Sequence, residues 1–325
     1  MAILIIGSGL VGSQIARILV EEGERPVILD VAPQPEALSD IVDLGRLTLR
    51  RGDVLNPFDL VRTIREAGIR RIIHTAANPM LTLGAQQDPY SAIQVNVMGT
   101  INVLEAARLH GIERVVVTSS NVLSFYLTGG EDKGDTSREE AFPRPSTFYA
   151  ATKQAVENLG LNYARWCNLD VVAVRFGAVA GPWRGRGGGG PSNIFRDLVE
   201  RSLRGEEAQI PPRNMDWVYS KDAGAGAVLA LKVRGLTSRV FNITMGRVYS
   251  AEQMIDAVKR VIPGARIRVE TPPGTEISVT EMEHPTDLSR SRAELGYAPK
   301  YDMEAAVRDY VEWYRDLIVR GAKGE

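Results

Sequence analysis

The residues best suited to chemistry are Tyr149 and Lys153, which lie four positions apart in a segment with helical spacing. Side chains at positions i and i+4 project from the same face of a helix. A phenol has a pKa near 10, too high for a base at neutral pH, but an ammonium about 5 Å away favours the phenolate by roughly 3 kcal/mol at an effective dielectric constant of 20. The pair predicts proton abstraction from a hydroxyl group; the alternative is an ordinary surface helix.

A polar run at 118–121 (TSSN) follows a predicted strand and supplies a second reactive group. Because ligands of open parallel sheets collect at the carboxyl ends of the strands, a hydroxyl here can hold a substrate oxygen against the tyrosine. We predict Ser120 for this role, with Ser119 as the second choice. The alternative is a serine-rich turn after the strand, since serine is a common turn residue.

Three glycines form the pattern G-x-G-x-x-G between an apolar strand at 2–6 and a helical segment at 13–22. Glycines let the backbone approach a pyrophosphate, which is bound by the unpaired amides and positive dipole of the helix N-terminus. The turn therefore predicts a dinucleotide site, and the alternative is a glycine turn that only packs a helix on a strand. The predicted contacts are Gly7, Gly9, Leu10, Val11 and Gly12.

Acidic residues at the ends of the next two predicted strands define the adenosine side of this site. Asp30 lies 18 residues beyond the last glycine, where a carboxylate accepts hydrogen bonds from ribose hydroxyls and repels a 2′-phosphate. This favours NAD over NADP. Arg50 and Arg51 favour the opposite choice, because basic side chains can bind a 2′-phosphate. Asp53, followed by Val54, is predicted to hydrogen-bond the adenine; an Asx turn is an equally good interpretation.

The elements that must position these groups alternate along the chain. Strand-like runs occur at 2–6, 26–31, 46–51, 71–75, 115–119 and 169–175. Helical segments lie near 57–67, 91–109 and 148–166. This alternation predicts an α/β fold, a Rossmann-type doubly wound parallel sheet covered on both faces.

Beyond Arg175 the glycine and proline content rises, which indicates a smaller C-terminal substrate-binding lobe. Later segments predict helices at 220–232 and 251–262, a strand at 240–244 and a closing helix from Met303 to Ile318. We expect an NAD-binding domain at 1–177 with a return segment near 215–245, and a discontinuous lobe at 178–325.

Composition excludes several classes of partner. The chain of 325 residues carries 39 basic and 40 acidic residues, a formal charge of −1, so no long-range field attracts nucleic acid or anionic lipid. A single cysteine, Cys167, and three scattered histidines predict neither disulfide nor metal site. The apolar start lacks a basic export region and no stretch is long enough to span a membrane. We expect a cytoplasmic protein, with Cys167 buried and His74 structural.

Together these residues resemble the extended short-chain dehydrogenase/reductases, also called the NAD-dependent epimerase/dehydratase family. The similarity runs nearly end to end. Besides the glycine turn, Ser120 and the Tyr149–Lys153 pair, it is carried by the segments 74–77 (HTAA), 96–100 (NVMGT), 175–182 (RFGAVAGP), 216–222 (DWVYSKD) and 287–297 (DLSRSRAELGY).

The resemblance implies a role for each matching position. Tyr149 would be the acid/base, Lys153 would bind the nicotinamide ribose and lower the tyrosine pKa, and Ser120 would orient the substrate oxygen. Ala76 and Ala77 would lie beside the cofactor and Asn96 in the supporting proton-relay region. The family's first turn glycine is replaced by Ile6. The resemblance also implies a homodimer built on the helices near 91–109 and 148–166.

Substrate and reaction direction stay open at this stage. Asn121 and Val122 beside Ser120 disfavour dehydration, which needs an added acid and base, and Met215 stands where family members that act on nucleotide sugars carry a phosphate-binding arginine. We therefore expect an NAD-dependent dehydrogenase acting on a small polyol, sugar or sugar-acid. The alternatives are a nucleotide-sugar epimerase that retains NAD and a non-catalytic NAD-binding regulator. Candidate substrate residues are Asn121, Arg184, Arg186 and Arg213.

Overall fold

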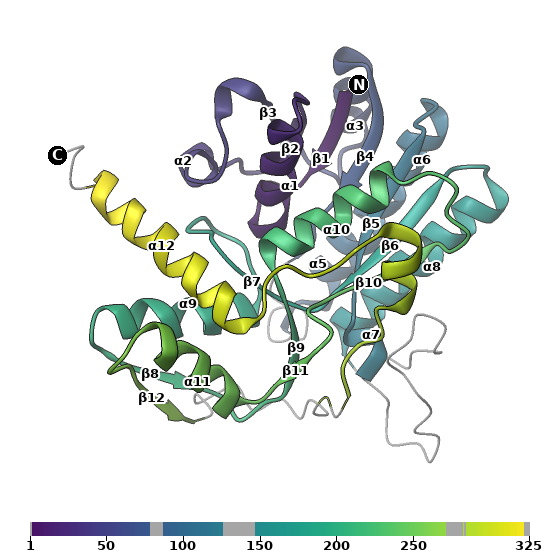
Figure 1. Cartoon of the computed structure of the whole chain (residues 1–325). Coiled ribbons are helices and arrows are strands. Elements are labelled where there is room, and N and C mark those ends of the chain that lie inside the picture. The colour runs from purple at the N-terminus through teal and green to yellow at the C-terminus, as the bar shows by residue number, and fades with distance from the viewer. Residues whose placement is uncertain (1, 79–86, 126–146, 271–281, 283, 322–325) are drawn as a thin grey trace.

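The computed structural model describes residues 2–78, 87–125, 147–270, 282 and 284–321. Its centre is a seven-stranded parallel sheet in the order β10-β6-β5-β4-β1-β2-β3 (Figure 1). The strands are β1 (Ala2–Ile6), β2 (Val27–Asp30), β3 (Thr48–Arg51), β4 (Ile69–His74), β5 (Arg114–Ser120), β6 (Val171–Phe176) and β10 (Val240–Ile243). The predicted fold class, a Rossmann-type doubly wound sheet, is confirmed.

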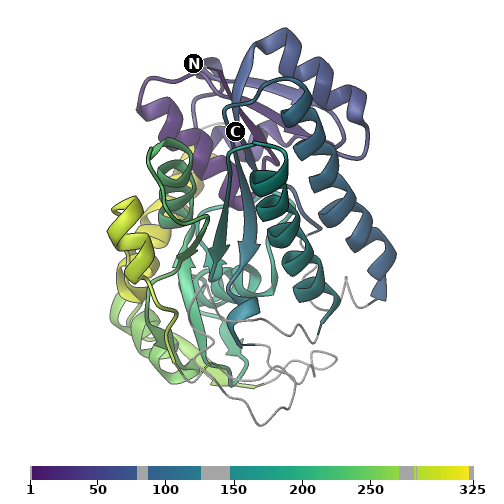
Figure 2. The ribbon, with the colours of Figure 1, turned by 90° about the vertical axis from the view of Figure 1, so that its right-hand side faces the viewer.

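Helices cover both faces of this sheet, as Figure 2 shows from the side. On one face α1 (Leu10–Glu21) packs against α10 (Ser220–Lys232); on the other lie α3 (Pro57–Ala67), α6 (Gly99–Leu109) and α8 (Phe148–Trp166). Alternate residues of β1 enter two different cores, with Ile3 and Ile5 in one and Leu4 and Ile6 in the other. Burial on both faces explains why the strands are continuous apolar runs.

The strand order reverses beside β1, which fixes where a ligand can bind. From β1 the chain runs outward through β2 and β3, then returns to β4 on the other side of β1. In open parallel sheets the crevice at such a reversal, beyond the carboxyl ends of the strands, is the ligand site. The glycine turn after β1 and the polar ends of β4 and β5 all face this crevice.

The helix expected near 91–109 is interrupted. The structure has α5 (Pro89–Ile93), a π-helical turn at Gln94–Met98 and then α6. Such π-turns are frequent at functional sites, and this one carries Asn96. The side chain of Asn96 bonds groups outside its own helix, which gives the irregular turn a local cause.

The smaller lobe is assembled from segments that the sequence did not mark as strands. One sheet contains β7 (Ala178–Ala180), β9 (Met215–Tyr219) and β11 (Val248–Tyr249), and another pairs β8 (Glu207–Ile210) with β12 (Arg266–Val269). The helices α9 (Gly190–Leu203), α11 (Ala251–Val261) and α12 (Met303–Gly321) pack around an aromatic core. Between these pieces, α10 and β10 return to the large sheet. The expected boundary after residue 177 falls between β6 and β7.

The expectation of a buried Cys167 is wrong, because its side chain is exposed. Cys167 follows the last turn of α8, and the buried apolar position there is taken by Leu169. Within the described residues no helix is long and apolar enough to cross a bilayer. The same residues contain no group of three or more histidine, cysteine or acidic side chains able to hold a metal ion.

Candidate active site

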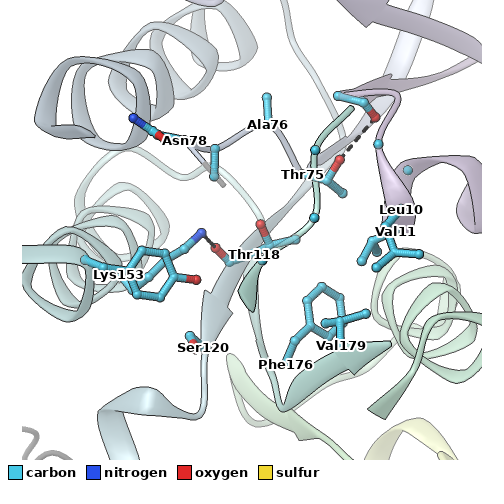
Figure 3. A pocket seen from close by; sticks show the side chains of 18 of the residues that line it. Leu10, Val11, Thr75, Ala76, Asn78, Thr118, Ser120, Lys153, Phe176 and Val179 are labelled. Atoms are coloured by element: carbon cyan, nitrogen blue, oxygen red, sulfur yellow. Dashed lines mark hydrogen bonds between the residues drawn. The ribbon is translucent and has the colours of Figure 1, made fainter. Parts of the chain in front are cut away.

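A large pocket runs from the glycine turn across the carboxyl ends of β4, β5 and β6 to the small lobe. Figure 3 shows it from close by, with Leu10 and Val11 on one side and Lys153 and Ser120 on the other. Most of the predicted cofactor residues line it: Gly7, Gly9, Leu10, Val11, Gly12, Asp30, Asp53, Val54, Ala76 and Ala77.

The glycine turn leaves the start of α1 open to an anion. Gly7 has a φ of +102°, which favours glycine, and a Cβ at Gly12 would lie 2.0 Å from the carbonyl oxygen of Gly7. A Cβ at Gly9 would meet nothing within 4 Å. Within the described residues no side chain caps α1, and its first turn carries no acidic residue. Free amides, a positive dipole and open space above Gly9 fit a pyrophosphate.

Asp30 is held rigidly at the next position along the crevice. One carboxylate oxygen accepts hydrogen bonds from the amide and hydroxyl groups of Ser8, both at 2.7 Å, and the other accepts from the amide of Ala32 at 2.8 Å. Asp53 lines the same pocket, and its carboxylate accepts from the amide of Leu55 at 2.9 Å. Asp53 therefore forms the Asx turn and also faces the adenosine side of the pocket.

Tyr149, Lys153 and Ser120 all line the opposite side of this pocket. The helix that carries the first two is capped at its start by Thr147, whose hydroxyl accepts from the amide of Ala150 at 3.1 Å. Lys153 is only 5% exposed and donates to the carbonyl oxygen of Thr118 at 2.9 Å (Figure 3). Its Nζ lies 5.7 Å from the centre of the Tyr149 ring.

Burial lowers the pKa of Lys153 from 10.5 to about 8. Near neutral pH the group is still predominantly an ammonium, and its weak solvation makes it a strong local field for an adjacent phenol. Ser120 accepts from the amide of Val122 at 3.2 Å, and its hydroxyl hydrogen is available to a substrate oxygen. Ser119 also lines the pocket but is 3% exposed, and its hydroxyl has no partner within the described part of the chain.

Asn96 lies behind the pocket wall and not on it. Its side-chain oxygen accepts from the amide of Asn78 at 2.7 Å, and its amide donates to the hydroxyl of Thr152 at 3.0 Å. That hydroxyl donates in turn to the carbonyl oxygen of Tyr149 at 2.8 Å. Asn96 therefore connects the loop after β4 to the first turn of α8, a supporting role.

His74, at the end of β4, is buried next to the helix that carries Asn96. The hydroxyl of Thr100 donates to the carbonyl oxygen of Asn96 at 2.6 Å and lies 3.1 Å from Nε2 of His74. Because that hydroxyl hydrogen is already used, Nε2 must carry the histidine's own proton. Burial and the charge of Lys153 lower the pKa of His74 to about 3. The neutral, enclosed ring agrees with a structural part for His74.

The candidate substrate residues are divided by the structure. Asn121, Arg186 and Arg213 line the pocket. Arg184 is not among the lining residues; it is 52% exposed and forms an ion pair with Asp40. The segment 183–186, which carries both Arg184 and Arg186, is fixed to the rest of the structure. Trp183 is buried, and its indole donates to the carbonyl oxygen of Arg186 at 3.1 Å.

Sequence reasoning did not predict the apolar and acidic residues at the small-lobe end of the pocket, although it had noted Met215 for the arginine that it replaces. These residues come from α9, β9 and the segment after β12: Ile194, Met215, Asp216 and Met282. Gly189 is the N-cap of α9, without a side-chain cap, so the glycine run opens a helix toward the pocket. The only feature of the sequence that could have indicated this end of the pocket is the glycine run at 187–190, because glycine turns before helices leave backbone amides open to anions.

The chain resembles known proteins in sequence and in fold. A model of the NAD dependent epimerase/dehydratase family matches residues 3–244. Sterol demethylase protein B of Methylococcus capsulatus is 28% identical, over 97% of this chain and 99% of the relative, and UDP-glucuronate 4-epimerase 1 of Arabidopsis thaliana is 24% identical, over 97% and 76%.

Two solved structures of UDP-glucose 4-epimerases share the fold. The enzyme of Thermotoga maritima, solved with UDP-glucose, has a TM-score of 0.83 at 22% identity, covering 98% of this chain and all of its own. The enzyme of Thermus thermophilus, solved with NAD, has a TM-score of 0.79 at 25% identity, covering 97% of this chain and 99% of its own.

Proposed function

The chain belongs to the NAD-dependent epimerase/dehydratase family, and we propose that it oxidises a secondary alcohol of a sugar, polyol or sugar-acid. The observation that carries this proposal is that Tyr149, Lys153 and Ser120 line the same pocket as the glycine turn and Asp30. A site that only bound dinucleotide would not require a phenol, an ammonium and a hydroxyl at its far end. This argues against the non-catalytic regulator.

Bound NAD⁺ would accept a hydride from the alcohol carbon; the protein's own residues handle the proton and the oxygen. Tyr149, as a phenolate, takes the proton of the alcohol. Lys153 favours that phenolate through its charge, and the carbonyl of Thr118 fixes the direction of the ammonium group. Ser120 donates a hydrogen bond to the substrate oxygen as it becomes a carbonyl.

A nucleotide-sugar epimerase is the second candidate function. Relatives named as UDP-sugar 4-epimerases favour it, as do Arg186, Arg213 and the uncapped start of α9, which would bind phosphate oxygens. Against it stands Met215, where family members that act on nucleotide sugars commonly carry an arginine. In an epimerase the hydride returns to the opposite face of the same carbon, so no reduced cofactor accumulates.

The test is incubation of the purified protein with NAD⁺ and a panel of sugars, polyols, sugar-acids and UDP-sugars. Dehydrogenation gives net nicotinamide absorbance; epimerisation gives a new sugar isomer without it. Tyr149→Phe should lower turnover by about 10³-fold while leaving NAD affinity unchanged. The matched control is Tyr163→Phe, because Tyr163 is on the same helix but bonds Glu105 outside the pocket. Equal activity of Tyr149→Phe and its parent would refute the mechanism.

We also propose a homodimer formed through α5, α6 and α8. The helix α8 contacts both α5 and α6, and the three helices carry large exposed apolar side chains, namely Tyr90, Ile93, Leu109, Phe148 and Trp166. Phe148 and Trp166 are 18 residues apart, five turns of a helix, and so share one face. Light scattering should give twice the mass of one chain; a single-chain mass would contradict this.

Cell fractionation tests the cytoplasmic location proposed from the single cysteine.

A further inference from the structure

The strongest unexplained group in the pocket is the carboxylate of Asp216. This residue is on β9, lines the pocket and is 1% exposed. It lies where the three-stranded sheet of β9 meets the end of β6 in the seven-stranded sheet. The two backbones are so close there that a Cβ at Gly177, just after β6, would be 2.6 Å from the carbonyl oxygen of Asp216. The mechanism above gives this buried acid no part.

The side chain of Asp216 joins segments that are far apart in the sequence. One oxygen, Oδ2, accepts from the hydroxyl of Thr244 and from the amide of Thr286, both at 2.9 Å. The backbone amide of Asp216 donates to the sulfur of Met282 at 3.4 Å. The end of β10 and the segment that follows β12 are therefore both held by one residue of β9.

This junction reaches the catalytic strand. The hydroxyl of Thr286 accepts from the side-chain amide of Asn121 at 3.5 Å. Asn121 follows Ser120 directly, and its backbone amide donates to the carbonyl oxygen of Phe176 at 2.9 Å. Asn121, Met282 and Asp216 all line the pocket. A shift of Thr286 would thus move two parts of the substrate wall together.

A carboxylate in this position is unfavourable for stability. Burial raises the pKa of Asp216 from 3.8 to about 6, against the hydrogen bonds from Thr286 and Thr244, which lower it. Ionisation at neutral pH therefore costs folding free energy that an uncharged side chain would not. Asp222 is a comparable buried acid, whose pKa burial also raises, but it bonds the amides of Lys300 and Tyr301 outside the pocket.

We propose that Asp216 is a positioning residue that fixes the wall formed by Asn121 and Met282 and so determines affinity for the substrate. The proposal rests on the function proposed above, because that wall lies next to Ser120. Asp216 does not touch the reacting atoms and takes no proton in the reaction. Its loss should raise KM and leave kcat nearly unchanged, whereas a defect in Tyr149 lowers kcat.

The test compares three variants in the NAD-loaded protein. Asp216→Ala should raise KM about tenfold, with kcat changed less than about threefold. Asp216→Asn keeps one acceptor oxygen for Thr244 and Thr286, so it should recover most of the affinity. Thr286→Val keeps the amide bonded to Asp216 but removes the acceptor for Asn121, and should raise KM about threefold.

The matched control is Asp222→Ala, which should lower stability without raising KM. An equal rise of KM in Asp222→Ala would overturn the proposal, since the effect would then be general loosening. A wild-type KM in both Asp216→Ala and Thr286→Val would also overturn it. If Asp216→Ala does not fold, Thr286→Val still decides the question, because it keeps the amide bonded to Asp216 and loses only the contact to Asn121.

A measurement without substrate separates this proposal from the proposed function. The methyl signal of Met282 in the NAD-loaded protein, assigned with Met282→Leu, should shift in Asp216→Ala and stay near its parent position in Asp216→Asn and Asp222→Ala. An unshifted signal in Asp216→Ala would overturn the positioning role. A shifted signal in a protein that turns over no secondary alcohol would support the positioning role and reject the proposed function.

Discussion

The two ends of the pocket are built in different ways. The end that we propose for the cofactor is formed by turns that directly follow β1, β2 and β3, and it is lined by exposed backbone and small residues such as Gly7, Gly9 and Gly12. The substrate end is formed by side chains from α9, β9 and the segment after β12, which are brought together only by the packing of the small lobe. Tyr149, Lys153 and Ser120 lie where the two ends meet.

The two ends of the pocket therefore differ in what recognises the ligand: mainly backbone groups at the glycine-turn end, and side chains at the small-lobe end. Backbone amides at a helix N-terminus bind phosphate groups in many unrelated proteins, because these amides do not depend on side-chain identity. Long side chains on separate segments can change singly without altering the sheet, so they set which substrate enters. The cofactor end should therefore respond to substitutions through steric strain, and the substrate end through lost polar contacts.

Lys153→Met at the meeting point should have the largest effect. Turnover should fall by about 10²- to 10⁴-fold because the phenolate loses its cationic neighbour. Stability should change with pH in a defined direction. Since burial lowers the lysine pKa to about 8, its charge opposes folding below that pH, and this cost disappears as pH rises from 8 to about 10.5.

Urea denaturation of the cofactor-free protein checks this stability change. The free energy of unfolding of the methionine variant, relative to the parent, should fall by about 3 kcal/mol between pH 8 and pH 10.5. Other titrating groups cancel in this difference. A difference that stays constant with pH would show that Lys153 is not desolvated as described.

Gly12→Ala and Gly9→Ala should separate packing from binding at the cofactor end. The new Cβ at residue 12 would lie 2.0 Å from the backbone oxygen of Gly7, so the turn must deform. We expect a loss of about 2 kcal/mol in stability and of roughly 50-fold in NAD affinity. Calorimetry measures both quantities.

At residue 9 a Cβ would meet no atom of the described residues within 4 Å. Gly9→Ala should therefore keep the parent's melting temperature and lose only NAD affinity, because the methyl group would occupy the space assigned to pyrophosphate. Unchanged affinity in Gly9→Ala would place the pyrophosphate elsewhere.

Arg213→Ala and Arg184→Ala should give the smallest and most specific effects. Arg213 lines the pocket, whereas Arg184 pairs with Asp40 outside it. Removing Arg213 should raise KM for an anionic substrate about tenfold, the usual value of one charge-assisted hydrogen bond. Removing Arg184 should change KM less than about twofold. Steady-state kinetics with both variants decide this, and equal effects would contradict the division of the two arginines.

The sequence was informative where a local pattern determines a local structure. The helices at 57–67, 148–166 and 220–232 have the predicted bounds because apolar spacing and their end residues act within the segment. The π-turn at Gln94–Met98 could not be read in this way, because its irregularity accompanies bonds from Asn96 to residues 18 and 56 positions away in sequence.

The same reasoning explains what was missed in the small lobe. Met215–Tyr219 (MDWVY) becomes a strand through pairing with Ala178–Ala180 and Val248–Tyr249, which no local pattern shows. Asp216 and Met282 enter the pocket only through this pairing and the docking of Thr286. Arg184 and Arg186 are two residues apart, and the sequence does not show that only Arg186 lines the pocket. That difference depends on the burial of Trp183 in the core that includes α2 (Pro35–Ser39).

The most direct test of the central claim is a crystal structure of the NAD complex. The nicotinamide ring should lie against the wall that carries Tyr149, Lys153 and Ser120. The space between the Tyr149 hydroxyl and nicotinamide C4 should hold one alcohol carbon and its oxygen, with reacting atoms about 3–3.5 Å apart. A nicotinamide ring bound away from Tyr149, or a Tyr149 hydroxyl directed to bulk water, would contradict the account.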